Sequence, residues 1–474
     1  MKSDANPDRR CFLKVAGALV GAASSPLNVY AQAETKLASG GKGMATSPMI
    51  VVHGGYTHQL PERPEDLQAA QDMLALITAQ AEDYLLGRSG DGRQHDAADT
   101  ARYAVELLEA SRIFNAGIGA RFQRDGDIRR TAAIMARSAE GMPVSGSIEV
   151  VPGVINPITI AYARFLEARR QGWAEQTAFT NAHLSGGASL EYLLASGVSI
   201  PGMKTGYQAT ARRRDELLEF AKHAGDQAAI DSDRHAASGT VGCVVMDTEG
   251  RFAAATSTGG TANNVPGRVG DAGTAGGTFA SHQGAASMTG DGEGIRNLAM
   301  ACGLVGALDF TDVDGAAQWM FRQAREKHVS AAAIFIGRGK GDQEVEVRCT
   351  DSDAALTFAY SRGDGNVQVF TANPAQYFTS DAELLAAKLG KEYRGFAKSI
   401  GSGRETIRVA MTPDRRQALD QSVERIKNLP ENLPVAFLPP QAIKGVVCDK
   451  GAIDMRAELA KVREAAGGSP AKGR

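Results

Sequence analysis

Apolar positions along the chain change their spacing several times, and each spacing predicts a different kind of element. Short apolar runs between glycine-rich or polar turns are typical of buried strands, whereas apolar residues three and four positions apart are typical of amphipathic helices. We therefore expect strands at 49–53, 131–137, 145–151, 240–247, 251–258, 276–280, 285–289, 329–336, 344–349, 356–360 and 367–370. Helices are expected at 64–87, 97–110, 157–170, 189–196, 294–308 and 316–328. Consecutive strand pairs separated by helices favour an α+β sandwich, in which helices cover a core of two sheets.

The most informative local prediction is a hairpin near the middle of the chain. The apolar runs 240–247 and 251–258 flank the turn Thr248-Glu249-Gly250, and such a turn is typical of antiparallel neighbours. The hairpin brings the start of its first strand beside the end of its second. We therefore expect the hydroxyl groups of Thr240 and Thr258 to lie next to each other.

Three segments lack this regular pattern. Residues 34–48 are rich in Ala, Ser, Gly and Lys and are predicted to be flexible. Between 197 and 239 the periodicity weakens, apart from a candidate helix at 212–223, and we interpret this segment as a mobile linker. Composition alone would favour an ordinary surface loop, and the position of the segment directly before Thr240 is what favours a linker. Residues 374–474 are predicted to be an extension of unassigned role, with helices at 381–390 and 413–427.

The first 33 residues have the layout of an export signal. Arg9-Arg10-Cys11-Phe12-Leu13-Lys14 resembles the twin-arginine motif, the apolar stretch 15–29 follows it, and Ala31-Gln32-Ala33 resembles a cleavage site. This arrangement predicts a periplasmic or secreted bacterial protein. A short membrane anchor is the alternative, but the apolar run is too short for a comfortable membrane span.

Composition narrows the range of partners. Hydrophobic residues make up 43% of the 474 residues and charged residues 22%, and the formal net charge is −2. These values are near those of ordinary globular proteins and give no reason to expect nucleic acid or an anionic membrane as partner. No Cys-x-x-Cys pair or Cys/His cluster occurs, so we expect no zinc site and no cofactor. Cys243, Cys302, Cys349 and Cys448 would permit one or two disulfides, although Cys243 lies in an apolar run typical of a buried strand.

The candidate chemistry centres on Thr240. A threonine hydroxyl is a poor nucleophile unless a base accepts its proton, and a free α-amine on the same residue can be that base. Cleavage between Gly239 and Thr240 would release such an amine, and glycine leaves the scissile carbonyl open to attack. The reference pKa of an α-amine is about 7.7–8.0, so the amine needs little tuning to act at neutral pH.

Several short motifs, in order along the chain, resemble those of one family. They are Val52-His53-Gly54-Gly55, Phe114-Asn115-Ala116-Gly117-Ile118-Gly119, Gly239-Thr240-Val241-Gly242, Thr256-Ser257-Thr258-Gly259-Gly260, Gly267-Arg268-Val269-Gly270-Asp271 and Thr289-Gly290-Asp291-Gly292-Glu293. With these motifs the chain resembles the plant-type asparaginases, which are isoaspartyl peptidases, N-terminal-nucleophile hydrolases and relatives of glycosylasparaginase. The resemblance runs from about 49 to about 370, interrupted between 197 and 238.

The resemblance implies an architecture. It implies a four-layer αββα sandwich, with 49–196 as the α-subunit part and 240–373 as the β-subunit part after self-cleavage at Gly239–Thr240. It further implies a homodimer of α/β pairs. A structural sodium is also implied, held by backbone oxygens of a loop whose matching residues are Leu108, Glu109, Phe114, Ala116 and Ile118.

The resemblance also assigns roles near the nucleophile. Thr240 is then the nucleophile and Thr258 the hydroxyl that orients it, although a threonine at a strand end often only bonds backbone. Thr289, through its hydroxyl, and Gly290, through its N–H, are the candidates for stabilising the oxyanion. From the residues alone, the turn that follows Thr289 would also suit a phosphate, but Glu293 would repel one.

Further residues are candidates for binding the substrate. Arg268 can grip a carboxylate in two parallel hydrogen bonds, and Asp271 can bind an ammonium group. Together they suit the α-carboxylate and α-amine of an aspartyl group, although an Arg–Asp pair at this spacing is commonly a surface ion pair. Gly292 is expected to contribute a backbone contact to the amine, and Asn115 to help hold the pocket.

The expected activity is hydrolysis of the side-chain amide of L-asparagine or of β-aspartyl dipeptides, through an aspartyl ester on Thr240. The near alternative is N4-(β-N-acetylglucosaminyl)-L-asparaginase activity, which has the same chemistry with a sugar on the leaving nitrogen. An uncleaved amino-acid-binding protein and a threonine endoprotease remain further alternatives. Thr131 and Asp291 depart from the usual family pattern near the pocket, and these departures leave the leaving-group preference open.

Overall fold

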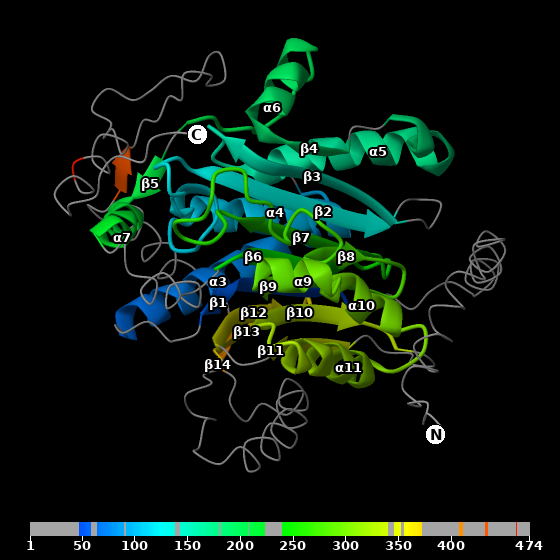
Figure 1. Cartoon of the computed structure of the whole chain (residues 1–474). Coiled ribbons are helices and arrows are strands. Elements are labelled where there is room, and N and C mark those ends of the chain that lie inside the picture. Colours follow the sequence, from blue (N-terminus) through cyan, green and yellow to red (C-terminus); the bar gives the residue numbers. More distant parts are fainter. Residues whose placement is uncertain are drawn as a thin grey trace, which may run out of the picture. The chain divides into compact units, whose positions relative to one another are not determined.

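The sheets and helices are seen in a computed structural model of the chain (Figure 1). The described residues are 47–57, 64–89, 92–137, 143–179, 182–206, 208–222, 239–339, 346–351, 355–371, 407–410, 432–434 and 461. All of them belong to the unit Ser47–Arg474. The predicted export signal at 1–33 and the predicted helices at 381–390 and 413–427 lie outside the described residues.

Two sheets carry most of the described strands. The larger has the order β14 (Ile407–Ala410), β13 (Asn366–Thr371), β12 (Ala355–Ser361), β1 (Met49–Thr57), β6 (Val241–Met246), β7 (Phe252–Thr258), β2 (Arg129–Arg137), β3 (Pro143–Pro152) and β4 (His183–Ser185). The smaller has the order β11 (Glu346–Asp351), β10 (Ala331–Gly337), β9 (Gly284–Gly290) and β8 (Thr278–Ala280). Neighbouring strands are antiparallel except β3 and β4. A separate small pair joins β5 (Gln208–Thr210) to β15 (Asn432–Pro434).

Helices cover the outer face of each sheet. The helices α3 (Pro64–Leu85), α4 (Ala97–Ala110) and α5 (Pro157–Phe179) pack on the larger sheet, and α10 (Met300–Ala307) and α11 (Val313–Glu326) pack on the smaller one. The sheets face each other, with β6 and β7 against β9 and β2 against β8. The helix–sheet–sheet–helix order confirms the predicted four-layer αββα sandwich.

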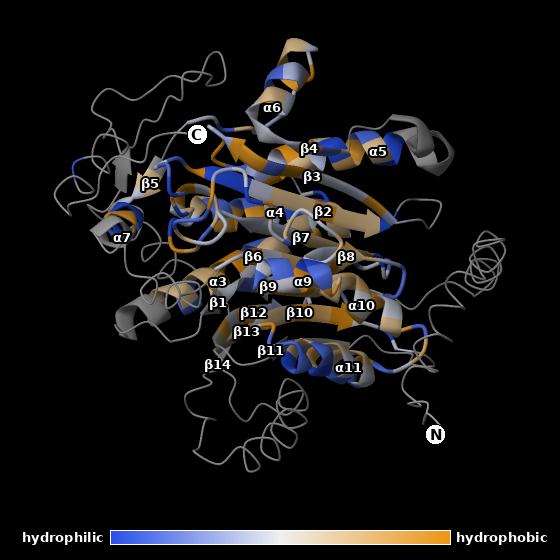
Figure 2. Cartoon of the chain, viewed as in Figure 1, coloured by the Kyte–Doolittle hydropathy of each residue, from blue (hydrophilic) through white to orange (hydrophobic). Residues whose placement is uncertain are grey.

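The alternation of side chains along β6 shows why this strand is apolar throughout. Cys243 and Val245 join the apolar cluster beneath the helices of the larger sheet, whereas Val244 and Met246 join the cluster between the two sheets. Successive side chains of a strand point to opposite faces, so a strand buried on both sides must be apolar at every position. In Figure 2, β10 and much of β3 carry hydrophobic colours, whereas much of α11 is hydrophilic.

The predicted hairpin at 240–258 is confirmed, with Val241 paired to Ser257 and Met246 to Phe252. The second predicted pair corresponds to β8 and β9. The other predicted strands also occur, as do the helices predicted at 64–87, 97–110, 157–170, 189–196 and 316–328, most of them with shifted ends. For example, α5 continues to Phe179 and α6 spans Gly186–Ala195.

The prediction of one continuous helix at 294–308 is wrong. The chain forms α9 (Gly292–Asn297) and then α10, with Ala299 between them in the left-handed region at φ 48°. At the start of α10, the N–H groups of Ala301 and Cys302 donate to the carbonyls of Gly276 and Ala275 instead of to a preceding helical turn. Tertiary bonds to the 275–276 loop therefore end one helix and begin the next.

Part of the segment 197–239 has regular structure. It contains β5 and the helix α7 (Ala211–Lys222), and α7 covers most of the helix predicted at 212–223. Arg213 is buried and donates from Nε to the carbonyl of Gly119 at 2.9 Å. Glu216 forms an ion pair with Arg121 at 3.1 Å. These contacts dock α7 on the 117–121 loop, while residues 223–238 lie outside the described part.

Cys243 and Cys302, whose side chains the structure describes, are free thiols. Cys243 is fully buried in β6, as its apolar run predicts, and burial raises the pKa of its thiol. Among the described residues, no helix combines the length and the apolar character that crossing a bilayer requires.

Candidate active site

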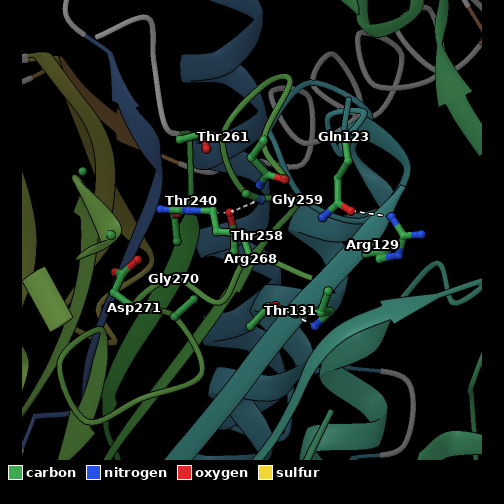
Figure 3. Close-up of a pocket in the computed structure, with 16 residues that line it drawn as sticks. Gln123, Arg129, Thr131, Thr240, Thr258, Gly259, Thr261, Arg268, Gly270 and Asp271 are labelled. Carbon is green, nitrogen blue, oxygen red and sulfur yellow. Dashed lines mark hydrogen bonds between the residues drawn. The ribbon is translucent and has the colours of Figure 1, made fainter. Parts of the chain in front are cut away.

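The two threonines of the hairpin meet at the bottom of a pocket (Figure 3). Thr240 precedes β6, and its Oγ1 donates a hydrogen bond to Oγ1 of Thr258 at the end of β7, at 3.1 Å. The Thr258 oxygen also accepts the N–H of Gly260 at 3.0 Å. The hydroxyl of Thr240 is thus oriented by a second hydroxyl, whose own position is fixed by backbone.

Glycines surround the peptide bond before Thr240. Gly239 lies in the left-handed region at φ 60°, where a side chain would be strained. A Cβ atom at Gly55 would lie 2.5 Å from the Cα of Gly239. The second glycine of the Val-His-Gly-Gly motif therefore lets β1 approach the chain immediately upstream of the candidate nucleophile.

Asn115 fixes the turn that follows Thr258. Its Nδ2 donates to the carbonyl of Gly260 at 2.6 Å, and its own carbonyl accepts the N–H of Gly259 at 2.9 Å. Its Oδ1 accepts the N–H of Arg121 at 3.0 Å. Asn115 is not among the residues lining the pocket. It supports one wall from behind.

The Arg268 guanidinium is held from one side by Glu293. Nε and Nη2 of Arg268 donate to the two carboxylate oxygens of Glu293 at 2.6 and 2.5 Å. This pairing uses the Nε–Nη2 edge of the planar group. The edge formed by Nη1 and the second Nη2 hydrogen has no other hydrogen-bond partner among the described residues, and it can still receive a carboxylate in two parallel bonds.

The Asp271 carboxyl is buried and incompletely bonded. Its Oδ2 atom has no hydrogen-bond partner among the described residues. Burial raises the pKa of this carboxyl to about 7. A buried carboxylate oxygen without a partner is costly, so this oxygen is suited to a cationic ligand.

Gly292 leaves room between these two side chains. A Cβ atom there would lie 2.9 Å from Nη2 of Arg268 and 2.9 Å from Oδ1 of Asp271. Glycine at this position therefore keeps the space between the guanidinium and the carboxyl open.

The two candidates for the oxyanion site lie at the end of β9. Gly290 lines the pocket and has φ 140°, and a Cβ atom there would lie 2.3 Å from the carbonyl oxygen of Ser330. Thr289 is fully buried and is not a lining residue. Asp291, which departs from the family pattern, accepts the N–H of Ser330 at 3.0 Å. Its carboxylate is thus bonded to the residue that precedes β10.

One pocket holds most of the site residues predicted from the sequence. Of the residues predicted from the sequence it brings together Thr240, Thr258, Arg268, Asp271, Gly290 and Gly292. It also contains polar residues that the sequence analysis did not select, namely Gln123, Arg129, Thr261 and Asn264. Gln123, Thr261 and Asn264 come from loops without periodic patterns, and Arg129 is the first residue of β2. Thr131 also lines the pocket, and the only earlier signal for it is its departure from the family pattern.

The buried histidine of the Val-His-Gly-Gly motif lies between the sheets. His53 Nε2 is 3.1 Å from Oγ of Ser287, which is 2.8 Å from Oγ1 of Thr256. Burial lowers the pKa of His53 to about 3, so its ring is neutral. It does not line the pocket, which agrees with a mechanism that needs no histidine base.

Architecture and site together define a class of protein. A four-layer αββα sandwich, with a threonine at the start of a central strand and a second hydroxyl bonded to it, is the arrangement of an N-terminal-nucleophile hydrolase. The family model described as asparaginase matches residues 46–358, and the chain belongs to this family.

Individual relatives agree with the family assignment. The chain is 33% identical over 210 residues to a protein of Macaca fascicularis and 32% identical over 209 residues to one of Homo sapiens, both named isoaspartyl peptidase/L-asparaginase. In each case the match covers 44% of this chain and 58% of the relative's length. A protein of the same name from Synechocystis sp. is 29% identical over 297 residues, which is 61% of this chain and 82% of that relative.

Proposed function

We propose that the chain is a self-cleaving amidohydrolase that acts on the side-chain amide of L-asparagine, on β-aspartyl dipeptides, or on both. The observation that carries the proposal is the 3.1 Å hydrogen bond between the hydroxyls of Thr240 and Thr258, within a pocket that also holds Arg268 and Asp271. The names of the relatives support the same substrate class.

The first step is cleavage of the Gly239–Thr240 peptide bond, which frees the α-amine of Thr240. That amine then takes the hydroxyl proton while Oγ1 attacks the substrate's side-chain carbonyl. We assign stabilisation of the tetrahedral oxyanion to the N–H of Gly290, which lines the pocket, with the hydroxyl of Thr289, buried next to it in β9, as the second candidate donor. Collapse breaks the carbon–nitrogen bond, returns the proton to the leaving amine, and leaves an aspartyl ester on Thr240. Water, deprotonated by the same α-amine, hydrolyses this ester and releases aspartate.

Two groups orient the aspartyl part of the substrate. The remaining edge of the Arg268 guanidinium receives the α-carboxylate, and the unpartnered Oδ2 of Asp271 receives the α-ammonium. Glu293 holds the guanidinium in place from the outside. The side-chain amide then extends toward Thr240, and Asn115 keeps the wall beside it in position.

One experiment tests the nucleophile and the cleavage together. Purified protein should show two fragments, ending at 239 and beginning at 240, on denaturing electrophoresis. Thr240→Ala should remain a single chain and lose hydrolysis of L-asparagine and of β-Asp-Leu. Hydrolysis by the uncut Thr240→Ala variant would contradict the nucleophile assignment. Turnover of glycosylated asparagine alone would favour the glycosylasparaginase alternative.

We further propose that the chain is exported and loses residues 1–33. The twin-arginine-like motif, the apolar stretch and the Ala-Gln-Ala site support this proposal. Amino-terminal sequencing of protein from the cell envelope should give one new end after Ala33 and another at Thr240. An intact Met1 in envelope-derived protein would contradict export by cleavage.

We also propose that a sodium ion can stabilise the 108–118 loop. The carbonyls of Phe114 and Ala116 each accept one N–H, and a carbonyl oxygen keeps a second lone pair for a cation. The carbonyl of Leu108 accepts both the N–H and the hydroxyl of Ser111, so it would have to exchange the hydroxyl for the ion. These oxygens, with those of Glu109 and Ile118, would hold the ion. It would stiffen the loop that carries Asn115 and would take no part in the reaction.

A further inference from the structure

The pocket extends beyond Thr240 on the side away from Asp271. In Figure 3, Asp271 and Gly270 lie on one side of Thr240, and Gln123, Arg129 and Thr131 lie on the other. If Asp271 holds the substrate's amine, the scissile nitrogen and its substituent point toward this second group. The residues there therefore face the leaving group.

The side-chain amide of Gln123 is oriented by Arg129. Nη1 of Arg129 donates to Oε1 of Gln123 at 2.5 Å, and the same guanidinium is paired with Asp125 at 2.9 Å and Asp127 at 3.0 Å. A guanidinium only donates, so the oxygen of the Gln123 amide must face it. The amide nitrogen is therefore turned into the pocket, as Figure 3 shows.

The nitrogen of this amide is available to a ligand. Gln123 is only 2% exposed yet lines the pocket. Among the described residues, Nε2 has no hydrogen-bond partner. Buried amide groups are normally bonded, so a donor left open at a cavity wall indicates a partner supplied from outside.

A second unsatisfied atom lies on the adjoining segment. Backbone bonds from Arg124 N to Asn264 O, at 3.0 Å, and from Asn263 N to Phe122 O, at 3.1 Å, hold the two segments side by side. Asn264 also lines the pocket, and its Oδ1 is buried without a partner in the described part of the chain. The wall therefore offers one open donor and one open acceptor.

We propose that Gln123 is a specificity-determining residue for the leaving group. Its Nε2 donates a hydrogen bond to a carbonyl or carboxylate oxygen of the amino acid that leaves a β-aspartyl dipeptide, and Oδ1 of Asn264 accepts an N–H from the same part of the substrate. Arg129 acts as a positioning residue that fixes the amide. This inference rests on the proposed function. L-Asparagine releases ammonia, which has no oxygen for Gln123 to bind, so the contact favours dipeptides over asparagine.

The test compares two substrates in one variant. Gln123→Glu keeps an oxygen facing Arg129 but replaces the open donor with an acceptor. We expect its kcat/KM for β-Asp-Leu to fall at least about 10-fold, the usual effect of losing a hydrogen bond to a charged group. We expect kcat/KM for L-asparagine to stay within about 2-fold, because that substrate never reaches the amide. Gln123→Leu, which removes the donor without adding charge, should show the same split.

Controls separate the inference from the function on which it rests. Gln318→Leu, on the exposed side of α11, should leave both substrates unchanged. If the wild-type protein hydrolyses neither substrate, the proposed function fails. If the wild type hydrolyses both and the two Gln123 variants lower both rates equally, or lower neither, the leaving-group role of Gln123 is overturned. Arg129→Met should lower the dipeptide rate less than Gln123→Leu does.

Discussion

The hydroxyl of Thr258 is the nearest side-chain partner of the candidate nucleophile, and its removal should be costly. Thr258→Val keeps the shape but leaves Oγ1 of Thr240 and the N–H of Gly260 without their acceptor. A hydrogen bond that supports developing charge contributes about 1.5–3 kcal/mol. We expect kcat for L-asparagine to fall about 10- to 100-fold, with slower self-cleavage measured on denaturing gels.

Thr258→Ser is the matched control, because it keeps the hydroxyl and loses one methyl group. It should retain most of the activity. Equal losses in the serine and valine variants would show that packing at the end of β7, and not the hydroxyl, is what matters.

Asp271 should make both substrate capture and stability depend on pH. Burial raises its folded pKa from 3.8 to about 7, so below about pH 7 the carboxyl of the empty protein is protonated and binds an ammonium group poorly. We expect kcat/KM to fall as the pH drops through about 7. The α-amine of Thr240 titrates nearby, so the acid limb of kcat/KM should be steeper than that of kcat.

The raised pKa of Asp271 also determines how the stability of the folded protein changes with pH. Between pH 3.8 and about 7 the folded protein keeps a proton on Asp271 that the unfolded chain has lost. Stability from this group is therefore lost as the pH rises through that window. Relative to Asp271→Asn, the wild-type Tm should decline from pH 4 to 7 and then level off. Parallel Tm curves for the two proteins would contradict the shift.

At the residue scale, the sequence motifs predicted only part of the pocket, namely the residues around the candidate nucleophile and the aspartyl-binding groups. Thr240, Thr258, Arg268 and Asp271 lie in short glycine-rich motifs, and the structure places all four at one cavity. Gln123 gave no such signal, because its role depends on a neighbour, Arg129, and on backbone bonds to the 263–264 segment. Contacts of that kind are created by tertiary packing and leave no local pattern.

Among the elements, the approach of β6 to β9 depends on Gly242. A Cβ atom there would lie 2.0 Å from Oγ of Ser287 and 2.6 Å from Nε2 of His53. Overpacking of this kind typically costs about 1–3 kcal/mol. We therefore expect Gly242→Ala to lower the free energy of unfolding by about that amount, measured by urea denaturation.

Gly306→Ala is the matched control for this substitution. Gly306 lies within α10, and a Cβ atom there meets nothing within 4 Å. Alanine is the better helix former by about 1 kcal/mol, so this variant should be slightly more stable than wild type. A Gly242→Ala protein as stable as wild type would show that the two sheets can separate at little cost.

The sequence predicted elements well where local chemistry decides them. The hairpin at 240–258 and the helix at 97–110 follow from apolar spacing and turn residues. The break at Ala299 did not, because alanine has no intrinsic preference for the left-handed region. Hydrogen bonds from Ala301 and Cys302 to the 275–276 loop impose the break. These partners are about 25 residues apart in the sequence, so a local pattern cannot reveal the contact.

For the molecule as a whole, the order of the strands in the sheets could not be predicted from the spacing of apolar residues. Antiparallel pairing of chain neighbours is predictable, but the larger sheet places β1 between β12 and β6, and β2 beside β7. Only the family resemblance indicated the four layers. That strand order also decides what self-cleavage does to the protein.

Cleavage before Thr240 should leave the two fragments locked together. The first fragment contributes β1, β2, β3 and β4 to the larger sheet, and the second contributes β6, β7, β12, β13 and β14. Because β1 lies between two strands of the second fragment and β2 pairs with β7, the fragments share backbone ladders on both sides of β6. The apolar clusters on both faces of the sheet also contain side chains from both fragments.

Cleaved protein should therefore elute from a native sizing column at the same volume as uncut Thr240→Ala, and the fragments should separate only in the urea that unfolds the sheet. Free fragments in native buffer would contradict this strand order. The interleaving also keeps the new amine in place, since β6 stays paired on both edges after the bond before Thr240 is cut.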